Sequence, residues 1–437
     1  NAIDEGDRGV NQLPYDTVIF DLDGTLCNAE QGIVSSAMYA LEELGYQLPE
    51  GVDPREMIGP PLVHGFEQVL GLPPEQTARA MELYSRYFDR EGMYKYTVYP
   101  HIRSILRALR AAGAYLAVAT SKSEKPCRAV LEHFALTRYF DKIVTADSSH
   151  SIAGKAELIR RALPERYHRA AMVGDRRYDM EGAKANGIDG IGAGYGYGSD
   201  QELRDAGAEH IVPDTEALRA LLCQGVDIPR GFFLTVEGPD GSGKTTQVNL
   251  LEKSLREYGF SVLRTREPGG CPISEDIRQI ILDTKNMEMS PACEALLYAA
   301  ARAQHVVQVI RPAVETGMLV LCDRFVDSSI AYQGGGRELG METVQQMNAP
   351  AVGDMMPDAT LYLDIDYRLA LQRRMGASAP DRLELEAFDF HERVQKTYER
   401  LVHDSRKRFM TVNADRDPMA VAKDALAMVL ARLEQEE

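Results

Sequence analysis

Short apolar runs that end in polar or glycine-rich motifs recur along the chain, and their order constrains the fold more than any other feature. Each run has four to six residues rich in strand-forming side chains, and amphipathic helical stretches separate the runs. The runs cover residues 17–20, 115–119, 170–173, 231–236, 318–322 and 360–363. This alternation predicts two successive α/β domains, each a doubly wound parallel sheet with crossover helices. Ligands bind such sheets at the carboxyl ends of the strands, where the polar motifs of this chain stand.

The domain boundaries follow from the places where this alternation breaks. Residues 29–97 have the pattern of consecutive amphipathic helices, for instance 32–41 and 75–87, which predicts a helical insertion behind the first strand. Residues 223–230 follow a helical run and precede a new strand, which favours a short linker. We therefore expect a tail at 1–14, a first domain at 15–222, a linker at 223–230 and a second domain at 231–437.

The charge of the chain limits its partners. Its 437 residues carry 49 Lys and Arg against 66 Asp and Glu, a net charge of −17. Such a chain lacks the basic field that draws a protein onto nucleic acid or an anionic membrane. No stretch approaches the ~20 apolar residues of a membrane helix, the N-terminus has no apolar signal core, and the six cysteines form no C-x-x-C pair. We expect a cytoplasmic protein that binds small phosphate compounds, without nucleic acid or membrane partners.

Carboxylates follow the strands of the first half in a specific order. Asp21 and Asp23 stand one residue apart behind a strand, so they point to the same side and repel each other. Such a pair favours a divalent cation, or a division between an ionised nucleophile and a protonated acid. A lone Asp-x-Asp is also common in turns, but the whole ordered set is far more specific. The set comprises Asp21, Asp23, Thr120, Lys155, Asp175 and Asp179.

These motifs resemble the haloacid dehalogenase superfamily, in particular its phosphatases with a helical cap. The resemblance covers about residues 15–222 and rests on Asp21-Leu-Asp-Gly-Thr-Leu26, Thr120-Ser, Lys155 and Gly174-Asp-Arg-Arg-Tyr-Asp179. The segments 59–62 and 195–198 are similar to the subgroup of phosphoglycolate phosphatases and 5′-nucleotidases. The resemblance implies a Mg²⁺-dependent phosphomonoesterase whose cap, residues 29–97, closes over the substrate.

The same resemblance implies a role for each residue of the set. Asp21 would attack phosphorus to form an aspartyl-phosphate, and Asp23 would protonate the leaving oxygen and then deprotonate the attacking water. Thr120 and Lys155 would hold the phosphoryl oxygens. Asn28 stands where the family often has Asp, close to the hinge of the cap. The metal site would comprise Asp21, Asp23, Asp175 and Asp179.

A phosphate-binding loop opens the second half. Residues 238–245 match G-x-x-x-x-G-K-[ST], follow a strand and precede a helical stretch at 246–258. The glycines let backbone N–H groups converge on phosphate oxygens, Lys244 neutralises charge, and Thr245 reaches Mg²⁺. We expect ATP to contact Gly238, Asp240, Gly241, Ser242, Gly243, Lys244, Thr245 and Thr246. The loop predicts a nucleotide site but does not fix its reaction, because many proteins with this loop are ATPases or GTPases.

Further segments resemble the thymidylate kinase family of the bacterial type. They are residues 265–270, 294–304, 323–325, 331–337 and Asp381-Arg382, within a resemblance that covers about 230–437. The resemblance implies transfer of a phosphoryl group from ATP to dTMP. The dTMP site would comprise Asp240, Glu267, Arg278, Tyr298, Arg302, Arg324, Ser329, Tyr332 and Gln333. Among them, Arg278 and Arg324 would hold the phosphate, Arg302 and Tyr298 the base, and Tyr332 would favour deoxyribose.

The cations for phosphoryl transfer are expected from a lid. The transferred group needs positive charge around its oxygens, and the phosphate-binding loop carries no Arg. Arg373, Arg374 and Arg382 flank residues 376–380. We expect Arg373 at ATP and Arg382 in catalysis together with Lys244 and Arg324, although each lid Arg also fits an ordinary helix-surface charge. The family resemblance further implies a homodimer through the second half.

Two alternatives remain open at this point. The first half can be a non-catalytic regulatory module, although a binding module has no need of paired acids beside a nucleophile. The second half can phosphorylate another nucleoside monophosphate or act as a switch ATPase. The sequence favours a bifunctional enzyme that joins a Mg²⁺-dependent phosphatase to a kinase for dTMP. The substrate of the phosphatase, phosphoglycolate or a nucleotide, is left undecided.

Overall fold

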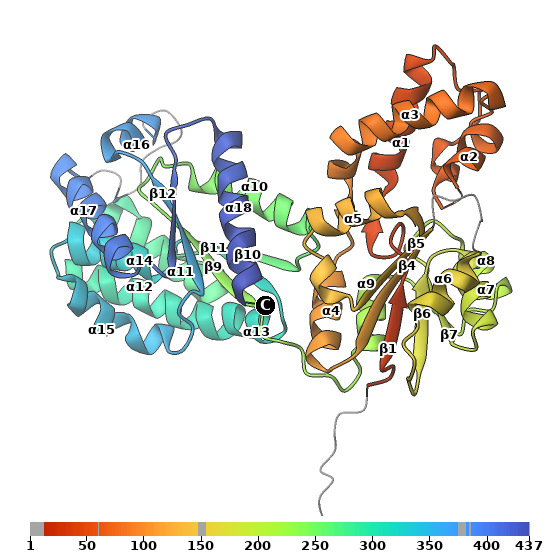
Figure 1. Ribbon diagram of the computed structural model, residues 1–437. Helices are drawn as coiled ribbons and strands as arrows, with labels where there is room; N and C mark the ends of the chain where they lie inside the picture. Colours follow the sequence, from red (N-terminus) through yellow and green to blue (C-terminus); the bar gives the residue numbers. More distant parts are fainter. Residues whose placement is uncertain (1–12, 60, 147–153, 375–381, 384–385, 437) are drawn as a thin grey trace, which may run out of the picture. The chain divides into compact units, whose positions relative to one another are not determined.

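The computed structural model describes residues 13–59, 61–146, 154–374, 382–383 and 386–436. The chain forms two compact units (Figure 1). Unit 1 runs to Ile228 and includes Glu257–Phe260, and unit 2 holds Pro229–Arg256 and Ser261–Glu437. Residues 1–12 of the predicted tail and 376–380 of the predicted lid lie outside the described residues. The linker at 223–230 stays a prediction.

Unit 1 is built on a six-stranded parallel sheet in the order β5-β4-β1-β6-β7-β8. The strands are β1 (Thr17–Phe20), β4 (Tyr115–Ser123), β5 (Lys142–Ala146), β6 (Ala170–Gly174), β7 (Asp189–Ala193) and β8 (His210–Val212). β1 lies between β4 and β6 and all four of its residues are buried, because the apolar run is covered on both faces. Phe20 pairs with Val118 and with Val173, so the loops behind these three strands begin at one edge.

The helices of unit 1 fall into two groups. Those that connect the strands are α4 (Ile102–Ala111), α5 (Glu124–His133), η4 (Thr137–Tyr139), α6 (Lys155–Ala162), α7 (Arg177–Ala185), α8 (Asp200–Asp205) and α9 (Thr215–Leu222). The predicted insertion contains α1 (Glu30–Glu43), η1 (Pro54–Met57), α2 (Leu62–His64), η2 (Gly65–Val69), α3 (Pro74–Arg90) and η3 (Gly92–Lys95). We call this group the cap. Figure 1 shows α1 and α3 packed side by side, away from the sheet.

Two short antiparallel strands join the cap to the sheet. β2 (Cys27–Asn28) pairs with β3 (Thr97–Val98), so the chain enters and leaves the cap at one place. α3 buries Thr77, Ala80 and Tyr84 on one face, the spacing that an amphipathic helix needs to cover a core. The hinge therefore lies directly behind the loop that follows β1.

Unit 2 has a five-stranded parallel sheet in the order β10-β11-β9-β12-β13. The strands are β9 (Phe232–Glu237), β10 (Val262–Arg266), β11 (Leu319–Asp323), β12 (Ala359–Asp364) and β13 (Phe409–Asn413). Asp323 pairs with Arg266 on one side and with Val236 on the other, so the loops behind β10 and β11 start beside the phosphate-binding loop, which follows β9. The two parallel sheets confirm the predicted fold class.

Helices surround the sheet of unit 2. They are α10 (Lys244–Glu257), α11 (Pro272–Leu282), η5 (Thr284–Asn286), α12 (Pro291–His305), η6 (Val306–Ile310), α13 (Arg311–Glu315), α14 (Val326–Ser329), η7 (Ile330–Gly336), α15 (Met341–Val352), α16 (Tyr367–Arg374), α17 (Phe388–Asp404) and α18 (Pro418–Glu436). Within the described part of the chain, no helix combines the length and apolar character required to cross a bilayer. All six cysteines are free thiols.

Candidate active sites

Three carboxylates of unit 1 meet at the carboxyl edge of its sheet. One oxygen from each of Asp21, Asp175 and Asp179 lies within 4.8 Å of the others. The strand register brings Asp21 and Asp175 together, because Asp21 follows β1 and Asp175 follows the neighbouring strand β6. Burial, reinforced by the charges of Asp179 and Asp21, raises the pKa of Asp175 well above its usual range. The cluster therefore holds more negative charge than its surroundings stabilise.

Lys155 neutralises part of this charge. Its Nζ lies 2.7 Å from Asp21 Oδ1 and 2.7 Å from Asp179 Oδ1. Burial alone would lower the pKa of Lys155, but Asp179 and Asp21 outweigh it and raise that pKa. Three carboxylates and one ammonium leave an excess of buried negative charge on oxygen ligands. This donor set fits a hard divalent cation such as Mg²⁺.

Asp23 lies apart from the three carboxylates. Its Oδ2 accepts a hydrogen bond from Lys122 Nζ at 2.6 Å, and Lys122 also donates to Tyr96 Oη at 2.9 Å. The backbone N–H of Lys122 donates to Thr120 Oγ1 at 3.2 Å, so Lys122 connects the predicted acid to the predicted phosphoryl-binding hydroxyl. The sequence analysis missed Lys122; its place two residues behind Thr120 was the only signal. The roles of Asp23 and Thr120 remain predictions.

The hinge of the cap is tied to the carboxylate cluster. Tyr197 donates its backbone N–H to Asp175 Oδ2 at 2.8 Å and its hydroxyl to Asn28 Oδ1 at 3.1 Å. Asn28 also accepts from Glu30 N at 3.0 Å, at the start of α1. Tyr195 donates to the carbonyl of Thr25 at 3.0 Å, in the loop behind β1. The segment 195–198, singled out in the sequence, thus connects the site to the cap.

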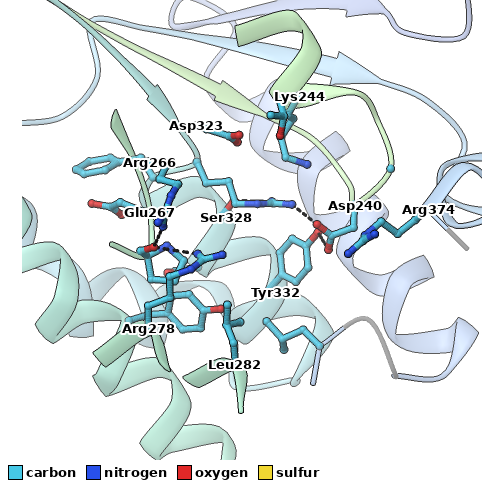
Figure 2. A pocket seen from close by; sticks show the side chains of 18 of the residues that line it. Asp240, Lys244, Arg266, Glu267, Arg278, Leu282, Asp323, Ser328, Tyr332 and Arg374 are labelled. Carbon is cyan, nitrogen blue, oxygen red and sulfur yellow. Dashed lines mark hydrogen bonds and ion pairs between the residues drawn. The ribbon is translucent and has the colours of Figure 1, made fainter. Parts of the chain in front are cut away.

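The phosphate-binding loop of unit 2 opens into a cavity of about 620 Å³. On the loop side, the cavity is lined by Asp240, Gly241, Gly243, Lys244, Thr245 and Thr246. Gly238 and Ser242 belong to the loop without lining the cavity. Figure 2 shows Lys244 and Asp323 at one end of the cavity and Arg278 and Leu282 at the other. A single space therefore joins the predicted ATP and dTMP residues.

The charged side chains at the loop end of the cavity lie close enough to shift one another's pKa values. Lys244 donates to the carbonyls of Gly238 and Pro239 at 3.0 and 2.8 Å, and burial together with Arg324 lowers the pKa of Lys244 to about 8. Asp240 forms an ion pair with Arg324 and accepts from Tyr332 Oη at 2.7 Å. Burial would raise the pKa of Asp240, but Arg324 and Lys244 hold it at about 2. Asp240 is therefore ionised at neutral pH.

Backbone conformation and a buried acid hold Arg324 in place. Arg324 has φ +70°, a left-handed conformation that is unfavourable for a residue with a side chain. The neighbouring strand β9 ends in Glu237, which accepts from Phe325 N at 2.7 Å, Ser328 Oγ at 2.6 Å and Tyr398 Oη at 2.8 Å. Burial, with the charge of Asp327, raises the pKa of Glu237. Glu237 was missed because nothing in the sequence marks it except its place before the loop.

The remaining residues predicted for the dTMP site also line the cavity. They are Glu267, Arg278, Tyr298, Arg302, Ser329 and Gln333; Arg324 and Tyr332, which contact Asp240, line the same cavity. Buried Arg302 donates to Glu267 Oε2 at 2.7 Å and to Ser329 Oγ at 3.2 Å. Glu267 is further bound by His305 Nδ1 at 3.0 Å, a residue three positions after Arg302 on α12 that the sequence analysis missed.

The structure separates the predicted lid arginines. Arg373 and Arg374 line the cavity, and Figure 2 shows Arg374 next to Asp240. Arg373 also donates to Ala414 O at 3.0 Å and to Asp415 at 2.8 Å. Arg382 does not line the cavity. Its buried side chain donates to Ile281 O at 2.9 Å and pairs with the buried Glu294, so its catalytic role stays a prediction without support from this geometry.

Comparison with known proteins agrees with both halves of the sequence analysis. Residues 18–193 match the family model of haloacid dehalogenase-like hydrolases, and residues 236–425 match that of thymidylate kinase. The thymidylate kinase of Pelobacter propionicus is 47% identical over 206 residues, which are 46% of this chain and 94% of that protein. The thymidylate kinase of Halothermothrix orenii is 50% identical over 190 residues, 43% of this chain and 90% of that protein.

Solved structures resemble about half of the chain. A predicted phosphatase from Clostridium acetobutylicum is 37% identical, covers 47% of this chain and 96% of its own, and has a TM-score of 0.43. A haloacid dehalogenase-like family protein from Streptococcus pneumoniae is 28% identical, covers 46% and 96%, and has a TM-score of 0.41.

Together, these findings define a two-unit enzyme of phosphoryl chemistry, with a haloacid dehalogenase-like hydrolase unit followed by a P-loop kinase unit. Through its second unit, the chain belongs to the thymidylate kinase family. Both resemblances that the sequence motifs carry are thereby confirmed.

Proposed function

We propose that unit 2 transfers the γ-phosphoryl group of ATP to dTMP, giving ADP and dTDP. The observation that carries the proposal is that one cavity is lined both by Lys244 of the phosphate-binding loop and by Arg278 and Arg324. An oxygen of the dTMP phosphate attacks the γ-phosphorus of ATP. The bond from that phosphorus to the oxygen shared with the β-phosphate breaks, and ADP leaves. Such a transfer requires positioning and positive charge more than covalent chemistry from the protein.

Each part of the cavity has a task in this reaction. Lys244 binds the β- and γ-phosphates, and Arg374, next to Asp240, supplies a second cation to the transferred group. Arg302 and Tyr298 hold the thymine base, and Tyr332, fixed by Asp240, fills the space a 2′-hydroxyl would need. Thr245 and Asp240 would hold Mg²⁺, which neutralises phosphate charge when it is bound. Asp323, whose Oδ1 is buried without a hydrogen-bond partner, supports a cation at this end.

A panel of nucleoside monophosphates with ATP and Mg²⁺ tests the kinase proposal. We expect dTMP to have the highest kcat/KM, because Tyr332 would disfavour ribose and Arg302, which lines the cavity, would bind the base. A higher kcat/KM for dGMP or dCMP would refute the assignment. ATP hydrolysis that no monophosphate accelerates would favour a switch ATPase instead.

We propose that unit 1 hydrolyses a phosphomonoester through an aspartyl-phosphate. Asp21 attacks phosphorus and the leaving oxygen takes a proton from Asp23; Asp23 then removes a proton from water, which cleaves the aspartyl-phosphate to give phosphate and free Asp21. Lys155, 2.7 Å from Asp21, stabilises the phosphoryl oxygens. Asp21, Asp175 and Asp179 would hold Mg²⁺, which supplies charge neutralisation for the attack. The buried cluster of these three carboxylates with Lys155 carries the proposal.

The substrate of unit 1 is sought among small phosphate compounds. A screen with Mg²⁺ of phosphoglycolate, pyrophosphate and nucleoside monophosphates tests the proposal directly. Because hydrolysis of dTMP would consume the substrate of unit 2, we expect dTMP to be a poor phosphatase substrate. An efficiency on dTMP comparable to that on the best substrate would contradict this expectation. No phosphate release from any compound would support a regulatory role for unit 1.

We further propose that the chain dimerises through unit 2. Ile273 and Ile280 of α11 and Leu296 of α12 are about half exposed, at 53%, 49% and 54%. Apolar side chains gathered on neighbouring helices are typical of protein interfaces. Light scattering of the purified chain tests the proposal, which predicts twice the mass of one chain, and a mass of one chain would refute it.

A further inference from the structure

Arg176 joins the loop that carries Asp175 to the cap of unit 1. Its Nη1 donates to the carbonyl of Ile58 at 2.8 Å, and Ile58 is buried in the core that the cap shares with the sheet. Its Nε donates to Glu202 Oε1 at 3.2 Å, at the start of α8. The fixed fork of a guanidinium thus bridges two elements that no strand or helix connects.

A glycine in the cap leaves space for this guanidinium. Gly59 has φ +103°, and a Cβ added there would lie 2.8 Å from Arg176 Nη1. A side chain at 59 would therefore displace Arg176 from the carbonyl of the preceding residue. Glycine is favoured at position 59 because the Arg176 side chain approaches it closely and leaves no space for a Cβ.

The backbone of the same residue holds the carboxylate cluster. The N–H of Arg176 donates to Asp179 Oδ2 at 3.0 Å, and Asp179 pairs with Lys155, which pairs with Asp21. One residue thus contacts the cap through its side chain and the cluster through its backbone. A single residue thus links Ile58 of the cap to the loop behind β6.

We propose that Arg176 is a positioning residue that fastens the cap loop 57–59 to the metal-binding loop, so that substrate is enclosed when the phosphoryl site is complete. The proposal rests on the proposed phosphatase function. Arg176 contacts the cluster through its backbone N–H, which a side-chain substitution retains, so loss of the guanidinium leaves the chemical step in place and weakens the enclosure of substrate. Arg176 thereby strengthens the binding of the substrate's leaving group beneath the cap.

Steady-state kinetics of the full chain with p-nitrophenyl phosphate and Mg²⁺ test the proposal. Arg176→Met should raise KM by about tenfold, as expected for one lost charge-assisted hydrogen bond, with kcat within about threefold of wild type. Arg176→Lys should give an intermediate KM, since one ammonium reaches only one of the two acceptors. A fall in kcat at unchanged KM would overturn the proposal, and so would an unchanged KM and kcat.

Two matched controls are available in the same unit. Arg177 begins α7, but its side chain is 56% exposed and pairs with Glu181 of the same helix, so Arg177→Met should leave KM unchanged. Gly59→Ala should reproduce the effect of Arg176→Met from the cap side. Gly51→Ala imposes a similar backbone strain at φ +85° with nothing within 4 Å, and should leave KM unchanged. Equal effects of the two glycine substitutions would contradict the proposal.

Hydrogen–deuterium exchange provides a readout independent of activity. We expect the amides of residues 57–59 to exchange about tenfold faster in Arg176→Met and Gly59→Ala than in wild type, Arg177→Met or Gly51→Ala. Unchanged exchange in both variants would refute the fastening of the cap. If the wild-type chain hydrolyses no phosphomonoester, the proposed function fails, while the exchange experiment still decides whether Arg176 holds the cap.

Discussion

Unit 1 gathers carboxylates around its site and unit 2 gathers cations, although both sites stand at the carboxyl edge of a parallel sheet. In unit 1, three acids are buried together and two of them, Asp21 and Asp179, pair with Lys155. We propose Asp21 as the nucleophile toward phosphorus. In unit 2, Lys244 and several arginines surround a cavity whose acid Asp240 is already paired with Arg324.

The difference in charge indicates a difference in reaction. A site that supplies its own carboxylate can form a covalent phosphoryl intermediate, and it needs added positive charge to do so. A site rich in cations attracts two phosphate-bearing substrates and aligns them, and the attacking oxygen belongs to a substrate. Single substitutions in each unit test whether the carboxylate-rich site and the cation-rich site carry out separate reactions.

Asp21→Asn should lower phosphatase kcat by about 10³-fold or more, because an amide cannot form the acyl phosphate. Kinase kcat should stay within about twofold, since independent sites do not share the residue. Phosphate release and a coupled ADP assay on the same preparation provide the two measurements. Loss of both activities would contradict independent sites.

Lys244→Met should lower kinase kcat by about 10²–10³-fold, the usual effect of removing one charge from a preorganised phosphoryl site. The substitution retains most of the apolar stem and removes only the ammonium. Phosphatase kcat serves as the internal control and should not change. A kinase rate within about threefold of wild type would remove Lys244 from the reaction.

Arg374→Met should lower kinase kcat by about tenfold or more, because this side chain lines the cavity. Arg382→Met should leave kcat within about threefold but lower the melting temperature by roughly 5–10 °C, because buried Glu294 loses a partner. Steady-state kinetics and thermal unfolding separate the two effects. If Arg382→Met lowers kcat more than Arg374→Met does, the sequence-based assignment of the catalytic lid Arg is right and the geometric one is wrong.

Asn28→Asp should have the smallest effect, within about threefold in phosphatase kcat/KM. Both hydrogen bonds to this side chain use its Oδ1 as acceptor, and Asp retains that oxygen. The added charge lies next to the N-terminus of α1, where a negative charge is favourable. Kinetics with p-nitrophenyl phosphate check the expectation. A large loss would mean that Asn is needed at the hinge for its amide.

The elements around both sites could be read from the sequence because each strand is a short apolar run that ends in a motif. The run 17–20 coincides with β1, and the register of β1 with β6 brings Asp21 to Asp175, as expected for neighbouring parallel strands. The helix behind the phosphate-binding loop begins at Lys244, two residues before the predicted start. Local pattern and topology suffice for such features.

Other features depend on contacts between distant segments, which no local pattern contains. Lys122, Arg176 and His305 belong to their sites because of partners 99, 118 and 38 residues away. Arg382 shows the opposite case: its position in the sequence suggests the lid, whereas a buried Glu294, 88 residues away, determines where the side chain lies. A charged residue lies where a partner compensates its burial, and only the fold determines that partner.

We infer that one chain contains two separate phosphoryl sites of opposite charge character. Crystals of the full chain soaked with Mg²⁺ and tungstate, a phosphate mimic with a strong anomalous signal, test this inference. Two anomalous peaks are predicted, one bounded by Asp21, Lys155 and Asp175 and one at the N-terminus of α10 beside Lys244. A peak at only one of these places would contradict the claim.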